Sequence, residues 1–403
     1  MTFPPRVKRF SRPNVFEIDL GAVARCVRQI RHCIGPAIHF FATLKSNAYG
    51  YGLIPAAKAV LASGADALSL VDLEDAIALR RARIEAPILV YAGSVPGKDI
   101  VRAVEKYDLI PTLHSEESLA AFARYATRET GVAVKVDIGP ERIGVPVEQA
   151  VAFVKSIAQH PKLRMHVINA HPSVPGKGSI GDCLDWQYRR FVGICDELEH
   201  AGIHVPFRVI ASSRILRMTG ASMVLNAVDP GAALFSPLAA DQPQDRYQPF
   251  RSLKSRLIQV KNVSRTEFLD EAPFRIIPNM RIGVIPIGYS DGMNKLHCGE
   301  VLVRGERVAI LGSPALEYTR VDLTRVPSAA VGDEVVIIGQ QNASRIDPEE
   351  VMAKQSAARV ADLALEVRAT IARVYVETSG EPTIAVPYGQ KNTNRLKSTS
   401  FKA

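Results

Sequence analysis

The stretch from about residue 36 to residue 235 contains eight short apolar segments that alternate with segments of helical pattern. The apolar segments are four to eight residues long and lack polar alternation, as in strands that are buried on both faces. We predict that they are strands: Ala37–Leu44, Ala67–Val71, Pro87–Ala92, Leu109–Leu113, Val132–Asp137, Met165–Ala170, Phe207–Ala211 and Val224–Ala227. Eight strand–helix repeats in this length predict an α/β fold with a closed (β/α)8 barrel of the TIM type. An open doubly wound sheet is the alternative, and periodicity alone does not separate the two.

The segments between these strands show the acidic first turns that are typical of helices. The clearest are Leu73–Ala82, Ser115–Thr127, Val147–Gln159 and Asp185–Ala201. Beyond about residue 245, short strands and turns rich in Gly, Pro and Asn predict a second, mainly β domain. We therefore predict a barrel domain over residues 1–245, a β domain over 246–388 and a polar, disordered tail over 389–403. The opening strand Asn14–Asp19 could join the β domain.

Composition narrows the class of protein. Hydrophobic residues make up 47% of the chain and charged residues 23%, which is the balance of a globular protein. No apolar run is long enough to cross a bilayer, and the basic N-terminus lacks the apolar segment of a secretory signal. The five cysteines show no metal-binding spacing, so we expect no metal site and a reduced, cytoplasmic protein. The net charge of +9 is dispersed and has no recognition motif beside it, so we expect no nucleic-acid partner.

A lysine stands at the end of the first predicted strand. Lys45 follows the apolar run, and Asn47, Gly50 and Gly52 come close behind it. Chemistry in a β/α barrel lies at the carboxyl ends of the strands. A partly desolvated lysine at such a position is suited to Schiff-base chemistry, and a tight turn behind it lets an anion approach backbone N–H groups. Taken alone, a strand-end lysine is more often a surface residue, so the wider motif decides.

The run from Leu44 to Gly52 reads L-K-S-N-A-Y-G-Y-G and resembles the cofactor-lysine motif V-K-A-N-A-Y-G-H-G of the alanine racemase family. Other segments resemble landmarks of this family in the same order: Glu17–Leu20, Val136–Gly144, Ile285–Gly292, Val331–Val335 and Ala372–Tyr375. The resemblance extends over nearly the whole chain. It implies an N-terminal (β/α)8 barrel that binds pyridoxal 5'-phosphate (PLP) and a C-terminal β domain, which agrees with the fold expected from periodicity.

The resemblance also implies roles for single residues of the barrel. The residues implied to bind PLP are Lys45, Tyr49, Arg142, His171, Ser213, Asp229, Gly231 and Ala232. The lysine would form the internal aldimine, with the arginine close to it and the histidine lining the cofactor at a strand end. The tyrosine hydroxyl, the serine and the backbone N–H groups of the Gly–Ala pair would hold the phosphate.

The side of the site opposite the lysine departs from the family. A racemase needs two bases, one on each face of a planar intermediate, and the family supplies the second as a tyrosine of the partner subunit in a V-S-Y-G motif. The corresponding position falls at Asp270 or Glu271, and no tyrosine lies between Tyr247 and Tyr289. A carboxylate has an ordinary pKa near 4, so it would need strong desolvation to act as this base. Tyr289 would reach the active site of the partner, so the resemblance implies a homodimer with shared sites.

Other departures concern the cofactor ring and the substrate. Asp229 stands in V-D-P-G, where the family has V-R-P-G with its arginine against the pyridine nitrogen. Asp229 would keep that nitrogen protonated, as acidic partners do in most other PLP enzymes. The plainer alternative is that Asp229 caps the turn before Pro230. Leu316 and Glu317 replace the family's M-D pair, and Ala358 stands about where the family has a further phosphate-binding tyrosine.

Three functions follow from this pattern. The leading one is an isomerase, a PLP-dependent racemase of a small amino acid, in which Lys45 acts on one face of Cα and Asp270 or Glu271 on the other. The second is a PLP-dependent lyase, decarboxylase or aldolase on the same scaffold, which Asp229 favours. The third is a non-catalytic homologue that binds PLP. The sequence does not identify the side chain of the substrate.

Overall fold

The computed structural model describes residues 12–175, 177–238, 249–264, 267, 272–277, 279–354, 360–376 and 383–385. These residues form two compact units. The barrel unit comprises the described residues within Gly21–Tyr49 and Leu53–Gln248, and the β unit comprises those within Met1–Leu20, Gly50–Gly52 and Pro249–Ala403. The expected boundary at residues 245 and 246 and the expected tail 389–403 lie outside the described residues.

The barrel unit is a closed sheet of parallel strands. In chain order these are β2 (His39–Thr43), β3 (Ala67–Leu70), β4 (Ile88–Val90), β5 (Ile110–Leu113), β6 (Thr130–Asp137), β8 (Leu163–Ala170), β9 (Phe207–Ala211) and β10 (Ala227–Val228). Each pairs with the next, β10 pairs back to β2, and all pairings are parallel. The short β7 (Val145–Pro146) pairs with β6 beside this circle. The sheet therefore closes as a (β/α)8 barrel, and the open alternative is wrong.

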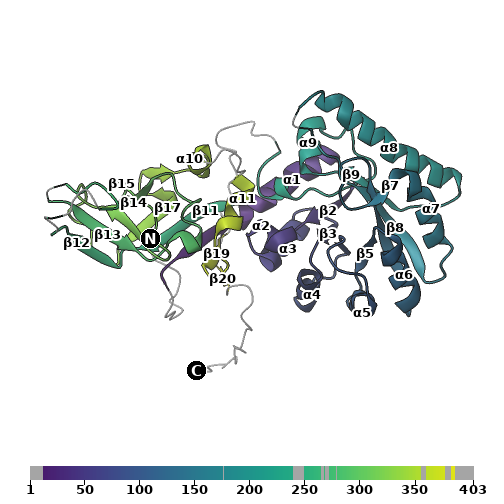
Figure 1. Ribbon diagram of the computed structural model, residues 1–403, viewed down its shortest axis with the longest axis horizontal. Helices are drawn as coiled ribbons and strands as arrows, with labels where there is room; N and C mark the ends of the chain where they lie inside the picture. Colours follow the sequence, from purple (N-terminus) through teal and green to yellow (C-terminus); the bar gives the residue numbers. More distant parts are fainter. Residues whose placement is uncertain are drawn as a thin grey trace, which may run out of the picture. The chain divides into compact units, whose positions relative to one another are not determined.

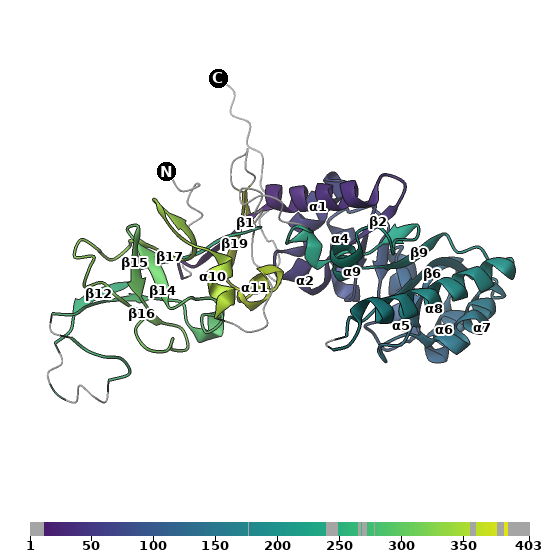
Figure 2. The same ribbon diagram turned by 90° about the horizontal axis from the view of Figure 1, so that it is seen from above.

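Helices cover the outside of these strands (Figures 1 and 2). They are α1 (Leu20–Ile34), α3 (Leu53–Ala62), α4 (Leu73–Arg81), α5 (Lys98–Lys106), α6 (Glu116–Tyr125), α7 (Val147–Ala158), α8 (Ile180–His200) and α9 (Ser213–Thr219). α6 begins at a capping box, in which the Ser115 side chain accepts from the backbone N–H of Ser118 and the Ser118 side chain accepts from that of Ser115. Such a box satisfies N–H groups that the first helical turn leaves unpaired.

The β unit is built around the opening strand of the chain. β1 (Val15–Asp19) lies between β11 (Phe250–Arg256), to which it is antiparallel, and β19 (Ala372–Val376), to which it is parallel. The same sheet contains β14 (Glu300–Val303), β15 (Glu306–Ala309), β17 (Glu334–Gln341), β18 (Ser344–Ile346) and β20 (Thr383–Ala385). A second sheet joins β12 (Gln259–Asn262), β13 (Arg281–Ile285) and β16 (Thr319–Asp322). Two helices, α10 (Pro348–Ala353) and α11 (Val360–Glu366), complete the unit.

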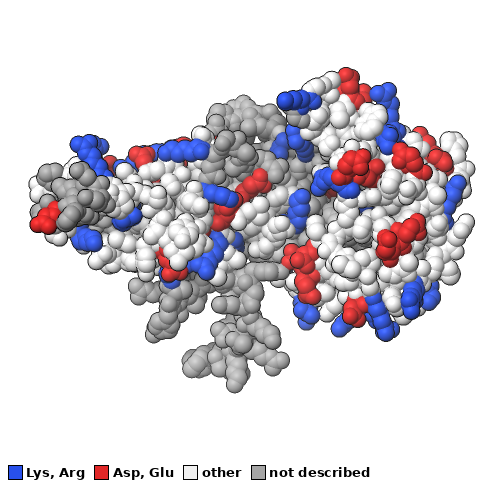
Figure 3. Space-filling model, viewed as in Figure 1, with Lys and Arg blue, Asp and Glu red and all other residues white. Residues whose placement is uncertain are grey.

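Charge on the barrel unit is mixed on the face that Figure 3 presents, where basic and acidic side chains are interspersed over the helices. Among the described residues, no helix combines the length and the apolar character that a bilayer crossing requires.

Candidate active site

Side chains of the barrel interior change from apolar to polar along the strands. One apolar layer consists of Phe41, Ala67, Leu89, Ala133, Val167, Val209 and Ala227. Because side chains alternate between the two faces of a strand, the residue two positions later points to the same side, nearer the carboxyl end. Those positions hold Thr43, Ser69, Tyr91, Lys135, Asn169, Ala211 and Asp229. The chain thus places polar groups at the carboxyl end of the barrel, where β/α-barrel enzymes have their sites.

Lys45 follows the end of β2 and begins the turn α2 (Lys45–Tyr49). The residues from Ser46 to Tyr49 have φ between 53° and 55°, which is the left-handed region. This backbone costs an L-residue about 1–2 kcal/mol. Asn47 supports the turn, because its Oδ1 accepts a hydrogen bond from the backbone N–H of Leu53 at 2.8 Å. Strain of this kind persists where surrounding contacts over-determine it, commonly at functional sites.

Tyr49 lies over the same strand ends. The centroid of its ring is 5.8 Å from the Lys45 Nζ and 5.6 Å from the centroid of the Phe235 ring. A Cβ at Gly231 would lie 2.3 Å from the Tyr49 hydroxyl oxygen, so the backbone at 231 approaches this hydroxyl in a way that only glycine allows. The structure therefore brings together Lys45, Tyr49 and Gly231 from three distant parts of the chain.

Ser213 completes this group. It begins α9, is 7% exposed, and its Oγ accepts hydrogen bonds from the backbone N–H groups of Gly231 at 2.8 Å and Ala233 at 3.0 Å. A hydroxyl that accepts twice still has its own hydrogen to donate. The Gly231 N–H is thus engaged by Ser213, and Ala232 is buried beside it in η1 (Ala232–Leu234).

Arg142 and His171 follow the ends of β6 and β8. Asp137 holds the loop of Arg142, because its carboxylate accepts from the N–H groups of Gly139 at 3.0 Å and Arg142 at 2.6 Å. The Arg142 side chain is exposed. Burial, reinforced by the neighbouring cations, lowers the pKa of His171 from its ordinary value of 6.5 to about 3, so its ring is neutral.

Two residues of the site, Tyr91 and Lys135, were absent from the sequence-based prediction. Tyr91 Oη donates to Asp229 Oδ2 at 2.6 Å, and the Lys135 Nζ lies 5.4 Å from the centroid of the Tyr91 ring. Burial lowers the pKa of Lys135 to about 8, and Asp229 opposes this shift. Burial raises the pKa of Asp229 to about 6, and Lys135 opposes that shift. The two-residue period from Leu89 and Ala133 is the sequence signal that points to both residues.

The structure describes only some of the site residues that were predicted in the β unit. Asp270 and Glu271 lie outside the described residues, as does Ala358. Tyr289 is 50% exposed and begins η3 (Tyr289–Asp291). Asp291 fixes this turn, because its carboxylate accepts from the Gly288 N–H at 3.0 Å and from both terminal nitrogens of Arg12 at 2.8 and 2.9 Å.

The segment with Leu316 and Glu317 lies beside the Tyr289 turn. The backbone N–H of Tyr289 donates to Ala315 O at 2.9 Å, and that of Ser290 donates to Leu316 O at 3.1 Å. Leu316 is 54% exposed and Tyr318 is 50% exposed. Two large exposed side chains therefore lie on the segment that is bonded to the Tyr289 turn of the β unit.

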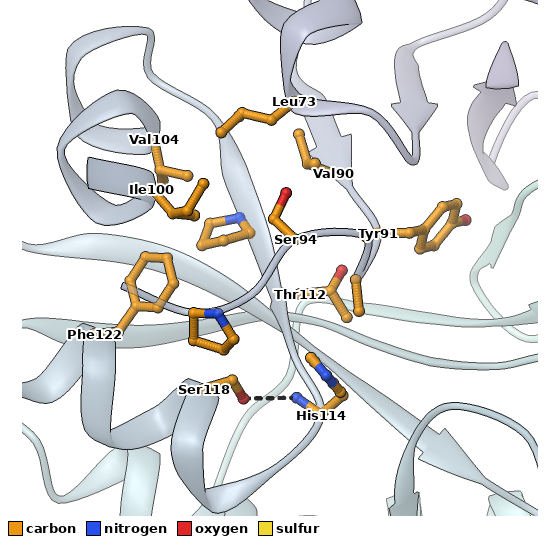
Figure 4. A pocket seen from close by; sticks show the side chains of 14 residues that line it. Leu73, Val90, Tyr91, Ser94, Ile100, Val104, Thr112, His114, Ser118 and Phe122 are labelled. Carbon is orange, nitrogen blue, oxygen red and sulfur yellow. Dashed lines mark hydrogen bonds between the residues drawn. The ribbon is translucent and has the colours of Figure 1, made fainter. Parts of the chain in front are cut away.

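A separate apolar pocket lies between the ends of β4 and β5 and the helices α5 and α6 (Figure 4). Leu73, Val104 and Phe122 line it, and none of the predicted site residues does. Tyr91 contributes to its wall, but in Figure 4 the Tyr91 ring points away from the other labelled side chains. The pocket is thus distinct from the polar group at the mouth of the barrel.

The residues at the barrel mouth fit PLP. Its phosphate fits the place where Tyr49, Ser213 and Gly231 converge, since loops after the seventh and eighth strands of such barrels commonly bind phosphate and these are β9 and β10 here. Its aldehyde carbon requires a lysine, which Lys45 supplies. Asp229 Oδ1, a buried acceptor with no hydrogen-bond partner in the part of the chain that the structure describes, suits a group that carries a proton.

Models of known families match most of the chain. The model described as alanine racemase, N-terminal domain, matches residues 18–238, and that described as alanine racemase, C-terminal domain, matches residues 250–375. The alanine racemase of Methanococcus maripaludis is 30% identical over 91% of this chain and 99% of its own length. That of Desulfovibrio desulfuricans is 31% identical over 91% of this chain and 99% of its own length.

Solved structures agree with this. The alanine racemase from Bacillus anthracis with bound L-Ala-P superposes with a TM-score of 0.78 at 27% identity, covering 93% of this chain and 98% of that one. The alanine racemase from E. faecalis gives a TM-score of 0.79 at 26% identity, covering 91% of this chain and 99% of that one. The chain therefore belongs to the alanine racemase family, whose members are PLP-dependent racemases.

Proposed function

We propose that the chain interconverts the L and D forms of a small amino acid, with alanine as the first substrate to test. The observation that carries the proposal is the convergence of Lys45, Tyr49, Ser213 and Gly231 at one end of the barrel. The relatives reported above are alanine racemases, which favours this reaction over the lyase, decarboxylase or aldolase that Asp229 alone would suggest, and over a non-catalytic homologue.

PLP, when bound, withdraws electrons from the Cα of an attached amino acid and makes its hydrogen acidic. Lys45 holds the cofactor and then removes or returns the Cα proton on one face. The hydroxyls of Tyr49 and Ser213 and the backbone N–H of Ala232 anchor the phosphate end, so the reacting carbon stays within reach of the lysine. The Gly231 N–H, expected from the resemblance to bind the phosphate as well, is engaged by Ser213 instead. Arg142 adds positive charge at the mouth, and neutral His171 lines it without competing for the proton.

The second proton transfer needs a base on the opposite face. We assign it to the β unit of a partner subunit, with Asp270 and Glu271 as the first candidates and Tyr318 as a further one, since its segment is bonded to the Tyr289 turn. The exposed side chains of Tyr289, Leu316 and Tyr318 support a homodimer with shared sites, because large exposed apolar groups commonly mark interfaces.

All five cysteines are free thiols. Three of them, Cys26, Cys195 and Cys298, are buried, and burial raises the pKa of the Cys26 and Cys195 thiols to about 12. A chain that carries only thiols suits a reducing compartment, so we place the protein in the cytoplasm. Cell fractionation tests this placement.

Proton exchange tests the proposed reaction. The protein with PLP is incubated with L-alanine in deuterated water, and both the Cα hydrogen and the hand of the product are followed. We expect deuterium to enter Cα and D-alanine to form. A new product without D-alanine would identify a lyase, and no exchange with any amino acid of a panel would identify a binder.

Borohydride reduction tests the lysine. We expect borohydride to fix PLP covalently on Lys45 in the wild type. The Lys45→Ala variant should be colourless and inactive before reduction and should carry no fixed PLP after it. Lys155→Ala is the matched control, since Lys155 is an exposed lysine on α7 and its loss should change neither property.

A further inference from the structure

Asp229 is a buried carboxylate with one satisfied and one unsatisfied oxygen. The residue is 7% exposed, and its Oδ2 accepts the Tyr91 hydroxyl at 2.6 Å. Its Oδ1 is buried and has no hydrogen-bond partner among the described residues. Leaving a charged oxygen buried without a partner costs several kcal/mol, so this geometry calls for a donor from outside the chain.

The backbone around Asp229 is held firmly. Thr43 Oγ1 donates to Asp229 O at 2.9 Å, and the Thr43 N–H donates to Pro230 O at 3.0 Å. Thr43 Oγ1 also bonds Ser69 Oγ at 2.7 Å. These bonds join the end of β10 to the end of β2, so the carboxylate is presented in one orientation beside the strand that leads to Lys45.

Asp229 lies close in the fold to both the phosphate-binding residues and Lys45. It stands two residues before Gly231, where the phosphate end is held, and on the strand next to β2, which ends just before Lys45. A ring anchored through its phosphate and its aldehyde carbon has two polar groups left, its hydroxyl and its nitrogen. The hydroxyl is next to the aldehyde carbon and so stays on the Lys45 side, whereas the nitrogen is on the opposite side of the ring. Two acceptors of this polar layer, Asp229 Oδ1 and Asn169 Oδ1, lack a partner among the described residues, and Asp229 is the one on the strand next to β2.

We infer that Asp229 Oδ1 accepts a hydrogen bond from the protonated ring nitrogen of PLP, and that Tyr91 positions the carboxylate by holding Oδ2. This inference rests on the proposed function, in which PLP is bound at Lys45. The ring nitrogen takes its proton from solvent on binding and keeps it, while Asp229 stays a carboxylate and Tyr91 keeps its hydroxyl hydrogen. No other atom changes its bonding.

The charges around the carboxylate are consistent with this arrangement. Lys135 and Lys45 face Asp229 and favour its ionised form, while burial disfavours it and sets its pKa to about 6 without a ligand. Burial raises the pKa of Tyr91 well above its ordinary value, so its hydroxyl remains a donor. A pyridinium placed against Oδ1 adds an opposite charge, which lowers the pKa of the carboxylate from this raised value and strengthens the bond.

Nitrogen NMR of the bound cofactor tests the inference. The protein is loaded with PLP that carries ¹⁵N in its ring, and the ring shift is measured across neutral pH. Protonated and neutral ring nitrogens differ widely in ¹⁵N shift. We expect the protonated value in the wild type and in Asp229→Glu, and the neutral value in Asp229→Asn. A neutral nitrogen in the wild type, or an unchanged shift in Asp229→Asn, would overturn the inference.

Cofactor affinity gives a second measurement that does not depend on turnover. The carbon analogue of PLP that lacks the ring nitrogen cannot make this bond. We expect the wild type to prefer PLP over this analogue by at least about tenfold, as a charge-assisted hydrogen bond implies, and Asp229→Ala to lose most of this preference. An equal preference in both proteins would contradict the inference.

Two controls separate this inference from the proposed function. Visible absorbance and borohydride trapping on Lys45 report cofactor binding independently of the ring nitrogen: bound PLP with a neutral nitrogen overturns only the inference, and no bound PLP overturns both. Asp66→Asn is the matched substitution, because Asp66 precedes β3 at the opposite end of the barrel and pairs with Arg31. It should leave the ¹⁵N shift unchanged.

Discussion

At the scale of single residues, Gly231 offers a direct test of the phosphate end of the site. Its φ of −118° is open to any residue, so only the space around it restricts the side chain. A Cβ there would lie 2.3 Å from the Tyr49 Oη and 3.0 Å from the Tyr49 Cζ. The contact is therefore steric, and the atom it meets is the hydroxyl that we propose binds the phosphate.

We expect Gly231→Ala to lower the free energy of unfolding by about 1–3 kcal/mol, because overpacking has a cost of this size, and to weaken PLP binding. Removing the hydroxyl in Gly231→Ala/Tyr49→Phe should recover much of the stability but not the affinity. Chemical denaturation and a PLP titration measure the two quantities. Wild-type affinity in Gly231→Ala would show that the phosphate does not bind here.

Site residues could be predicted from sequence where they belong to a family motif or follow the two-residue period of a strand. Lys45, Tyr49 and Gly231 stand in a recognisable order, and the structure brings them together. Tyr91 and Lys135 stand inside apolar strands, where a polar side chain carries no signal until the barrel is known to be closed. Once closure is established, the two-residue period places both on the interior. Asp229 could be selected from sequence, but its bond with Tyr91 could not.

At the scale of elements, the turn α2 departs most from what sequence suggests. Ser, Asn, Ala and Tyr all carry a Cβ, and such residues rarely occupy the left-handed region in succession. No local pattern predicts this backbone, because surrounding contacts impose it. By contrast, the barrel strands were predictable from their apolar runs. β11 is harder to predict from sequence, because three charged residues, Arg251, Lys254 and Arg256, interrupt its apolar pattern.

Asn47 provides a test of this turn. Asn tolerates positive φ better than Ala does, and its side chain also accepts the Leu53 N–H. We expect Asn47→Ala to lower the free energy of unfolding by about 1–3 kcal/mol and to weaken the link between PLP and Lys45. Asn47→Gly should be milder, since glycine accepts the backbone and loses only the hydrogen bond.

The chain supplies a matched control for this substitution. Asn342 has a φ of 54° in the turn between β17 and β18, within the β unit. Asn342→Ala should cost a comparable amount of stability and leave PLP affinity unchanged. Differential denaturation and cofactor titration distinguish the two sites. If Asn47→Ala bound PLP as tightly as Asn342→Ala, the left-handed turn would have no part in holding the lysine.

At the scale of the whole molecule, segments that are adjacent in the sequence belong to different structural units. β1 lies between β11 and β19, whose residues are more than two hundred positions away, and Gly50–Gly52 belongs to the β unit although the residues on both sides belong to the barrel unit. Gly50 and Tyr51 are held there by bonds from Arg373 and Tyr375 to their carbonyls. The sequence allowed the first strand to be placed in the β domain. It did not identify β11 and β19 as its partners, because no local pattern specifies a pairing between residues so far apart.

Mixed dimers test the assembly that we propose. If each site takes Lys45 from one subunit and the Tyr289 turn from the other, Lys45→Ala and Tyr289→Phe should each be nearly inactive alone. Co-expressed with different tags, they should form mixed dimers in which one of the two sites has both intact residues. Random pairing makes half of the dimers mixed, so about a quarter of the wild-type activity should return.

The exposed position of Tyr289 makes this outcome informative. Its turn is fixed by Asp291 and Arg12, so Tyr289→Phe removes a hydroxyl at the surface of the β unit and leaves the fold of that unit intact. Recovery in the mixture therefore cannot come from refolding of either variant and must come from complementary sites. If purified mixed dimers stayed inactive while each variant remained dimeric by sedimentation, the two residues would have to act within one chain. The second base would then have to be sought in the same subunit as Lys45.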